Sequence, residues 1–163
     1  VNIISQVQRQ LKKGSKAGLL SLDLRKFYDR IPRDKLRIRL HALGIRHNLL
    51  ELIMYSIDHL KYGAKINNHS SPGTVHEIGI PQGSILSPLF AAIFSAELPG
   101  ILKAELNVSS HQFADDNMAL SHSYDWNIIE SSLGETLHKF HKWCTTNSMQ
   151  YALSKCKVLM ICD

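Results

Sequence analysis

Three acidic residues form the most informative pattern in this 163-residue chain. Asp115 and Asp116 are adjacent at the expected tip of a hairpin, and Asp23 follows the apolar segment 17–22 far upstream. Carboxylates grouped in this way can hold two divalent metal ions about 4 Å apart, which activate one oxygen and stabilise a leaving oxygen in an in-line phosphoryl displacement. The pattern therefore predicts metal-assisted phosphoryl transfer, provided that the fold brings the three acids together.

Each of these acids also has an ordinary structural explanation. An Asp-Asp pair between short strands is often only a turn, because Asp tolerates turn dihedral angles and hydrogen-bonds its own backbone. A charge after a buried strand, such as Asp23, is usually the exit of that strand to solvent. Short strands expected at residues 108–114 and 118–121 favour the site, since they put Asp115 and Asp116 at the apex of a hairpin.

Three segments of the chain resemble motifs A, B and C of reverse transcriptases. They are the run Leu22-Asp23-Leu24-Arg25-Lys26-Phe27-Tyr28-Asp29-Arg30-Ile31, the run Gly79-Ile80-Pro81-Gln82-Gly83-Ser84-Ile85-Leu86-Ser87-Pro88-Leu89, and Phe113-Ala114-Asp115-Asp116. The tail resembles the region that follows in non-LTR (LINE-type) retrotransposons; its matching residues are Trp143, Asn147, Met149-Gln150-Tyr151 and Lys155-Cys156-Lys157-Val158. These motifs occur in the family's order and cover most of the chain from about Leu19 onward.

The resemblance implies a catalytic role for the three acids. Asp23, Asp115 and Asp116 would be the catalytic set, and Asp23 and Asp115 would ligate two Mg²⁺ ions, for which Mn²⁺ could substitute. The backbone carbonyl of Leu24 is a further possible ligand, and Asp116 completes the acidic set. Hard divalent cations favour such oxygen ligands.

The resemblance also implies a nucleotide-binding set. Tyr28 matches the aromatic residue that blocks a ribose 2′-hydroxyl, although it could equally be a core aromatic. Gln82 matches a side chain near nucleotide and template, and Gly83 would permit a close backbone approach. Lys155 matches a lysine near the triphosphate that protonates the leaving pyrophosphate; Lys157 would point to the same side of an extended segment, so the choice between the two lysines stays open.

Charge is distributed unevenly along the chain. Residues 1–66 carry 14 Lys and Arg against 5 Asp and Glu, a net charge of +9, whereas residues 67–163 carry 5 against 9, a net charge of −4. This asymmetry favours contact between the first part of the chain and nucleic acid. A solvated helix surface is the alternative for the basic residues of the expected helix 32–44, which has Leu36, Leu40 and Leu43 as its apolar face. Those basic residues are Arg33, Lys35, Arg37 and Arg39.

Composition is that of a single folded domain. With 44% hydrophobic residues, the chain is long enough to bury one core. Three cysteines without CxxC spacing predict reduced thiols and an intracellular protein rather than a disulfide framework. Pro88, Glu97 and Pro99 interrupt the apolar stretch 85–102, which predicts a buried helix and no membrane partner. His138, His141 and Cys144 share a helix face, but they lack an evident fourth zinc ligand.

The order of the expected elements predicts an α+β fold. We expect helices at residues 3–13, 32–44, 47–60, 84–106 and 127–147, the helix at 84–106 being broken near Pro88 or Pro99. We expect strands at 19–23, 108–114, 118–121 and 158–161, and a hairpin from segments 62–67 and 74–78. This order predicts a split βαβ, ferredoxin-like sheet with helices on one face, which is the architecture of a polymerase palm.

The sequence thus predicts one reverse transcriptase domain fragment, 1–163, made of the palm with part of the fingers. Residues 1–16 and about 32–80 would be fingers-side elements, and the thumb is absent, so we expect the segment alone to be a poor enzyme. The implied activity is RNA-directed DNA polymerisation in retrotransposition. The partners would be an RNA template, a DNA primer and deoxynucleoside triphosphates, in the cytoplasm and nucleus.

Three alternatives stay open. The chain could be a decayed or domesticated copy that binds RNA without polymerising, or the reverse transcriptase of a group II intron or a retron. A viral RNA-dependent RNA polymerase is the third, and Tyr28 argues against it. The family pattern also has departures: Phe27 replaces a common alanine, Asn117 a common threonine and Ala152 a common asparagine.

Overall fold

The computed structural model describes residues 2–103, 107–113 and 116–162. The chain forms two compact units. The first, here named the sheet unit, comprises Val1–Arg25 and Ala96–Asp163, and the second, the helical unit, comprises Lys26–Ser95. Among the described residues, no helix is long and apolar enough to cross a membrane.

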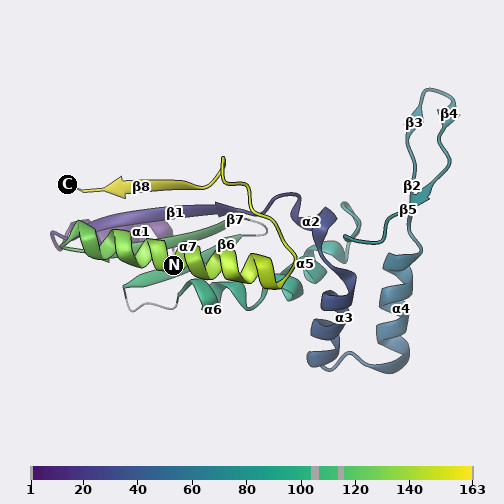
Figure 1. Ribbon diagram of the computed structural model, residues 1–163, viewed down its shortest axis with the longest axis horizontal. Helices are drawn as coiled ribbons and strands as arrows, with labels where there is room; N and C mark the ends of the chain where they lie inside the picture. Colours follow the sequence, from purple (N-terminus) through teal and green to yellow (C-terminus); the bar gives the residue numbers. More distant parts are fainter. Residues whose placement is uncertain (1, 104–106, 114–115, 163) are drawn as a thin grey trace. The chain divides into compact units, whose positions relative to one another are not determined.

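The sheet unit is built on one four-stranded antiparallel sheet with the strand order β6-β7-β1-β8 (Figure 1). Its strands are β1 (Lys16–Asp23), β6 (Val108–Phe113), β7 (Asp116–Ser123) and β8 (Lys157–Ile161). Its helices are α1 (Ile3–Leu11), α6 (Leu98–Leu102) and α7 (Trp126–Thr146). Strand β1 lies between β7 and β8, and Ala17, Leu20 and Leu22 on it are buried.

Helices α6 and α7 cover one face of this sheet. A Cβ atom on Gly18 would lie 2.5 Å from Ile129 Cγ2 and 2.9 Å from Leu133 Cδ1, so the absence of a side chain at Gly18 lets α7 approach β1 closely. Ser110 of β6 donates a hydrogen bond to the Pro99 carbonyl of α6 at 2.6 Å. The covered face therefore contains Gly18, Leu20 and Leu22 of β1, because alternate residues of a strand share a face.

Helix α1 contacts the sheet from the opposite face. Gln6 Oε1 accepts a hydrogen bond from Ser109 Oγ at 2.9 Å and lies 3.2 Å from His111 Nε2. Burial lowers the pKa of His111. Ser109 of β6 pairs with Leu120 of β7, and Leu120 pairs with Leu19 of β1. Paired residues share a face of the sheet, so this second face contains Leu19 and, by alternation, Ser21 and Asp23.

The sheet unit agrees with the predicted α+β class and with most of the predicted elements. On α7, Ile129, Leu133, Phe140 and Trp143 are buried, whereas Ile128, the neighbour of Ile129, is 51% exposed. The predicted helix 84–106 was wrong in its start, but the break predicted near Pro88 or Pro99 is present, next to Pro99. It begins at Ser87 as α5 (Ser87–Ser95) and restarts as α6, with Pro99 at the start of the second helix, where its missing N–H costs nothing.

The helical unit contains four helices and a narrow arm. Besides α5, its helices are α2 (Phe27–Arg30), α3 (Arg33–Ala42) and α4 (His47–Asp58). The predicted hairpin is two short ladders, β2 (Lys61–Tyr62) with β5 (Thr74–Val75) and β3 (Lys65–Ile66) with β4 (His69–Ser70). In Figure 1 these ladders extend as one arm beyond the end of α4.

The apolar side chains of α3, α4 and α5 form the core of the helical unit. Leu36 and Leu40 of α3 are fully buried, as are Ile57 of α4 and Phe94 of α5. Leu43 was predicted on the same face, but its side chain is 64% exposed because α3 ends at Ala42.

Backbone contacts fix the segment that leads into motif B on the helical unit. Gly79 N donates to the Ile31 carbonyl at 2.9 Å, and Ile80 N donates to the Tyr28 carbonyl at 2.8 Å. Gly79 has a φ of +85°, and a Cβ there would lie 2.6 Å from the Asp29 carbonyl oxygen. Only glycine therefore allows this close approach.

A matched pair of glycine substitutions tests this contact. Gly83 has a similar φ of +88°, but a Cβ there would have no heavy atom within 4 Å. We expect Gly83→Ala to cost only the left-handed strain of about 1–2 kcal/mol. We expect Gly79→Ala to cost about 1–3 kcal/mol more, because it adds a steric overlap with backbone. Urea unfolding measures the difference, and equal costs would contradict the close approach.

Candidate functional site

The pairing of β1 with β7 brings two of the three predicted acids together. Asp23 and Asp116 are Cα partners at the last position of the antiparallel register. Directly opposite residues share a face of the sheet, so the two carboxylates lie on the face opposite α7. Asp115 lies outside the described residues. Because Asp116 is the first residue of β7 and Phe113 the last of β6, residues 114 and 115 connect the two strands.

Both described acids are accessible from solvent. The Asp23 side chain is 23% exposed, and Asp116 is exposed. Carboxylate oxygens are the ligands that hard divalent cations prefer, and an open face leaves room for further ligands from a substrate. Within the described residues no group of three potential metal ligands gathers. The third predicted acid, Asp115, lies outside those residues. Asp23 and Asp116 therefore supply two carboxylates of the kind that a divalent cation prefers.

Lys155 contacts one of these acids. Its ammonium Nζ lies 3.5 Å from Asp23 Oδ2. The segment before it is held to the end of β1, because Ala152 N donates to the Asp23 carbonyl at 3.0 Å and Leu24 forms a bridge with Tyr151. Lys157 is opposite Ser21 on β8 and hence on the same face of the sheet. Of the two lysines that the sequence left open, Lys155 is the one in contact with Asp23.

In the helical unit, the residues predicted to bind a nucleotide lie on adjoining segments. Tyr28 of α2 is half-buried, whereas its neighbour Phe27 is 2% exposed and packs against Phe94. Phe27 is therefore the core aromatic. Gln82 is exposed, and its Nε2 donates to Asp29 Oδ1 at 3.0 Å. Asp29 thus links α2 to motif B, a contact that sequence analysis did not identify.

A pocket opens on the helical unit next to these segments. The basic residues Lys26, Arg30 and His76 line it, together with Asp29 and residues 78–80. Lys26 has a φ of +50°, a conformation that non-glycine residues rarely adopt and that often marks functional sites. The lining is compatible with an anionic group such as a phosphate.

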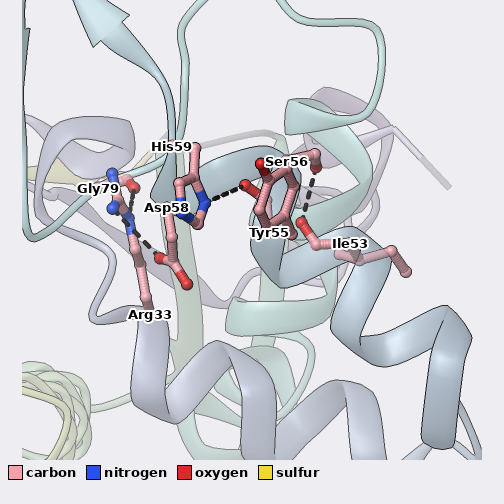
Figure 2. A network of polar contacts seen from close by, with 7 residues as sticks. All are labelled: Arg33, Ile53, Tyr55, Ser56, Asp58, His59 and Gly79. Carbon is pink, nitrogen blue, oxygen red and sulfur yellow. Dashed lines mark hydrogen bonds and ion pairs between the residues drawn. The ribbon is translucent and has the colours of Figure 1, made fainter.

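The basic residues of α3 divide into different environments. The guanidinium of Arg33 is buried between Asp58 and the Gly79 carbonyl (Figure 2), so in this structure it is not on the surface predicted to contact nucleic acid. Arg37 pairs with Glu51 of α4, and Arg39 lies over the Phe94 ring at 4.6 Å. Lys35 is partly exposed, like Arg37 and Arg39.

Two of the residues considered as zinc ligands, and two aromatic residues of the same helix, have contacts or burial that explain them structurally. Phe140 and Trp143 are buried, and Trp143 Nε1 donates to Glu97 Oε1 at 2.7 Å. His141 Nδ1 lies 3.2 Å from the Tyr151 hydroxyl. Burial raises the pKa of the Cys144 thiol to about 12, with a smaller contribution from Cys156.

The family of the chain follows from its sequence as a whole. Residues 2–161 match the family described as "Reverse transcriptase (RNA-dependent DNA polymerase)". The chain belongs to this family of nucleotidyltransferases, and the prediction of a reverse transcriptase domain is confirmed.

Among curated proteins, the chain is similar to the RNA-directed DNA polymerase from mobile element jockey of Drosophila funebris. The two are 26% identical over 160 residues, which are 94% of this chain and 17% of that protein. The chain therefore spans about a sixth of the length of the curated relative that it matches.

Solved structures share the fold at low sequence identity. Apo telomerase from Candida tropicalis, truncated from the C-terminal domain, superimposes with a TM-score of 0.70 at 14% identity, over 98% of this chain and 35% of that chain. Telomerase from Candida albicans in complex with a TWJ fragment of telomeric RNA has a TM-score of 0.66 at 17% identity, over 96% and 29%. The palm-like α+β fold predicted from sequence is confirmed.

The raised pKa of Cys144 gives a prediction. At pH 8 its thiol stays protonated in the folded protein, because pH is far below the pKa of about 12, and only a thiolate reacts readily. We expect iodoacetamide to modify the exposed Cys162 and to leave Cys144 unmodified until urea unfolds the protein. Peptide mass spectrometry measures both sites. Modification of Cys144 at the rate of Cys162 in the folded protein would contradict its burial.

Proposed function

We propose that this chain is the palm, with part of the fingers, of a retrotransposon reverse transcriptase that adds deoxynucleotides to a primer 3′-hydroxyl on an RNA template. Residues 1–16 and about 32–80 are the proposed fingers-side elements. Membership of the family supports RNA-directed DNA polymerisation, and similarity to a mobile-element polymerase supports a non-LTR retrotransposon as its source. The single observation that carries the proposal is the register that pairs Asp23 with Asp116.

The proposed metal ligands are the acids at the end of that register. Asp23 and Asp115, with the Leu24 carbonyl, would hold two Mg²⁺ ions, and Asp116 would complete the acidic set; Mn²⁺ could substitute. When bound, such ions would activate the primer oxygen and stabilise charge on the leaving pyrophosphate. The accessible carboxylates of Asp23 and Asp116 on one face support this assignment.

Lys155 is the proposed proton donor to the leaving pyrophosphate. Its Nζ carries the proton, and its contact with Asp23 at 3.5 Å supports a position beside the metal ligands. A positioned general acid contributes roughly 10²–10⁴-fold to a rate. In the same contact, the ammonium offsets the negative charge of Asp23.

Tyr28, Gln82 and Gly83 are the proposed nucleotide-binding residues. The half-buried ring of Tyr28 would exclude a ribose 2′-hydroxyl by its bulk, which makes the enzyme specific for deoxynucleotides. Gln82 would contact the nucleotide or the template with the part of its amide that Asp29 leaves available. Lys35, Arg37 and Arg39 would contribute to nucleic-acid binding. In an active element, the protein would act in the cytoplasm and the nucleus.

Primer extension tests this function. The protein that carries the chain in its complete reading frame is assayed on an RNA template with a DNA primer and Mg²⁺. We expect incorporation of deoxynucleotides, reduced at least about 100-fold in Asp23→Asn and Asp115→Asn, because each removes a charged ligand. Asp34→Asn, at an exposed acid in the first turn of α3, is the matched control and should extend like the wild type.

Two results would contradict the proposal. Efficient incorporation of ribonucleotides by the wild-type protein would indicate an RNA polymerase. RNA binding without any extension would indicate a decayed copy of the element that no longer polymerises.

The steric role of Tyr28 gives a second prediction. Tyr28→Ala removes the ring and should raise ribonucleotide incorporation relative to deoxynucleotide incorporation by about tenfold or more, because a missing steric block relaxes discrimination at the sugar. Tyr28→Phe keeps the ring and serves as the control, with discrimination unchanged. Single-nucleotide incorporation measured with dCTP and CTP gives the ratio. An unchanged ratio in Tyr28→Ala would show that the side chain is only a packing residue.

A further inference from the structure

Arg33 is a buried cation that joins three segments of the helical unit. Its side chain is 7% exposed. Nε donates to the Gly79 carbonyl at 2.8 Å, and the nitrogen Nη1 lies 3.3 Å from Asp58 Oδ1. Figure 2 shows the guanidinium between the end of α4 and the backbone of Gly79. The start of α3, the end of α4 and the segment entering motif B thus meet at one side chain.

Both partners of this ion pair occupy positions that their own helices disfavour. Arg33 is the first residue of α3, where the helix dipole favours an acid. Asp58 is the last residue of α4, where the dipole favours a base. Neither the charge of Arg33 nor that of Asp58 stabilises its own helix. The pairing is therefore explained by the segments that the two side chains join.

A contribution to folding stability is also a poor explanation for the buried guanidinium of Arg33. The third guanidinium nitrogen, Nη2, is buried and has no hydrogen-bond partner in the part of the chain that the structure describes. Burying a charge with an incomplete set of partners is costly, and apolar side chains of similar volume are often equally stable. The fork of donors of an arginine instead fixes the relative orientation of the groups it binds.

The Gly79 carbonyl, which Arg33 binds, belongs to a segment that adjoins the proposed nucleotide-binding residues. Gly79 N and Ile80 N donate to the carbonyls of Ile31 and Tyr28, at 2.9 and 2.8 Å. Three residues after Gly79, the amide of Gln82 is hydrogen-bonded to Asp29. The segment 79–82 is therefore held against α2 by its own backbone hydrogen bonds and by the contact of Arg33 with the Gly79 carbonyl.

We infer that Arg33 is a positioning residue for nucleotide selection. Through the Gly79 carbonyl it holds the segment 79–82, and hence Gln82, in a fixed relation to Tyr28, while Asp58 orients its guanidinium. The inference rests on the proposed function, because it concerns the nucleotide site of that reaction. The sequence alone does not indicate this role, because Arg33 is one of four basic residues on the same helix. Arg33 is buried, whereas the other three are partly exposed.

The chain offers a matched control for this inference. Arg37 and Glu51 form a second Arg–carboxylate pair between the same two helices, but at partly exposed side chains. Arg33→Met and Arg37→Met each remove one guanidinium, and Asp58→Asn and Glu51→Gln each remove one carboxylate charge. Asp58→Asn keeps the volume of the side chain and serves if Arg33→Met fails to fold. Arg33→Lys keeps the charge without the fork of donors.

Steady-state kinetics in the complete protein provides the first readout. We expect Arg33→Met to raise the KM for deoxynucleotides about tenfold and to lower discrimination against ribonucleotides by a similar factor, since small misplacements of a binding group have large effects. The kcat should change much less. Asp58→Asn should shift KM and discrimination in the same direction, Arg33→Lys should not restore them, and Glu51→Gln should match the wild type.

Hydrogen exchange provides a readout that does not depend on activity. The amides of Gly79 and Ile80 should exchange faster in Arg33→Met and Asp58→Asn than in the wild type, and at the wild-type rate in Arg37→Met. Equal exchange in Arg33→Met and Arg37→Met, or an unchanged KM and ribonucleotide discrimination in folded Arg33→Met, would overturn the inference. A wild-type protein that extends no primer would instead overturn the proposed function, while exchange would still report whether Arg33 holds the segment.

Discussion

The antiparallel register between β1 and β7 is the constraint on which the candidate metal site depends. Eight Cα pairs run from Lys16 opposite Ser123 to Asp23 opposite Asp116. Because side chains alternate between faces, a shift of one residue would turn one of these acids toward α7 and bury it in an apolar layer. The register is specified by burial: Leu20, Leu22 and Ala119 must face the core, and Gly18 must lie beneath α7. The apolar residues of β1 and β7 thus position the two acids at one end of the strand pair.

Much of the sheet unit could be predicted from sequence because its signals are local. Short apolar strands, the two neighbouring acids and the long amphipathic helix each carry a clear pattern. Which of two neighbouring isoleucines of α7 is buried was harder to predict. Ile128 and Ile129 are adjacent and equally apolar, and the contact between Ile129 and Gly18 of a distant strand decides which one is buried.

The helical unit was less predictable because its arrangement depends on contacts between segments far apart in sequence. The spacing of Arg33, Lys35, Arg37 and Arg39 indicates a basic surface, yet Arg33 is buried against residues 25 and 46 positions away. One signal was available: a base that opens a helix and an acid that ends another both oppose the helix dipole, and such charges can be expected to pair. The link between Asp29 and Gln82 had no comparable signal, because the two residues are 53 positions apart and form no local pattern.

The outer strand β8 has a consequence for handling the protein. Within the described residues it pairs on one side only, with β1, and Val158, Leu159 and Met160 are 57%, 56% and 44% exposed. A strand edge that is both unpaired and apolar is a template for adding another strand. Preparations of this segment by itself will therefore tend to associate edge to edge as concentration rises.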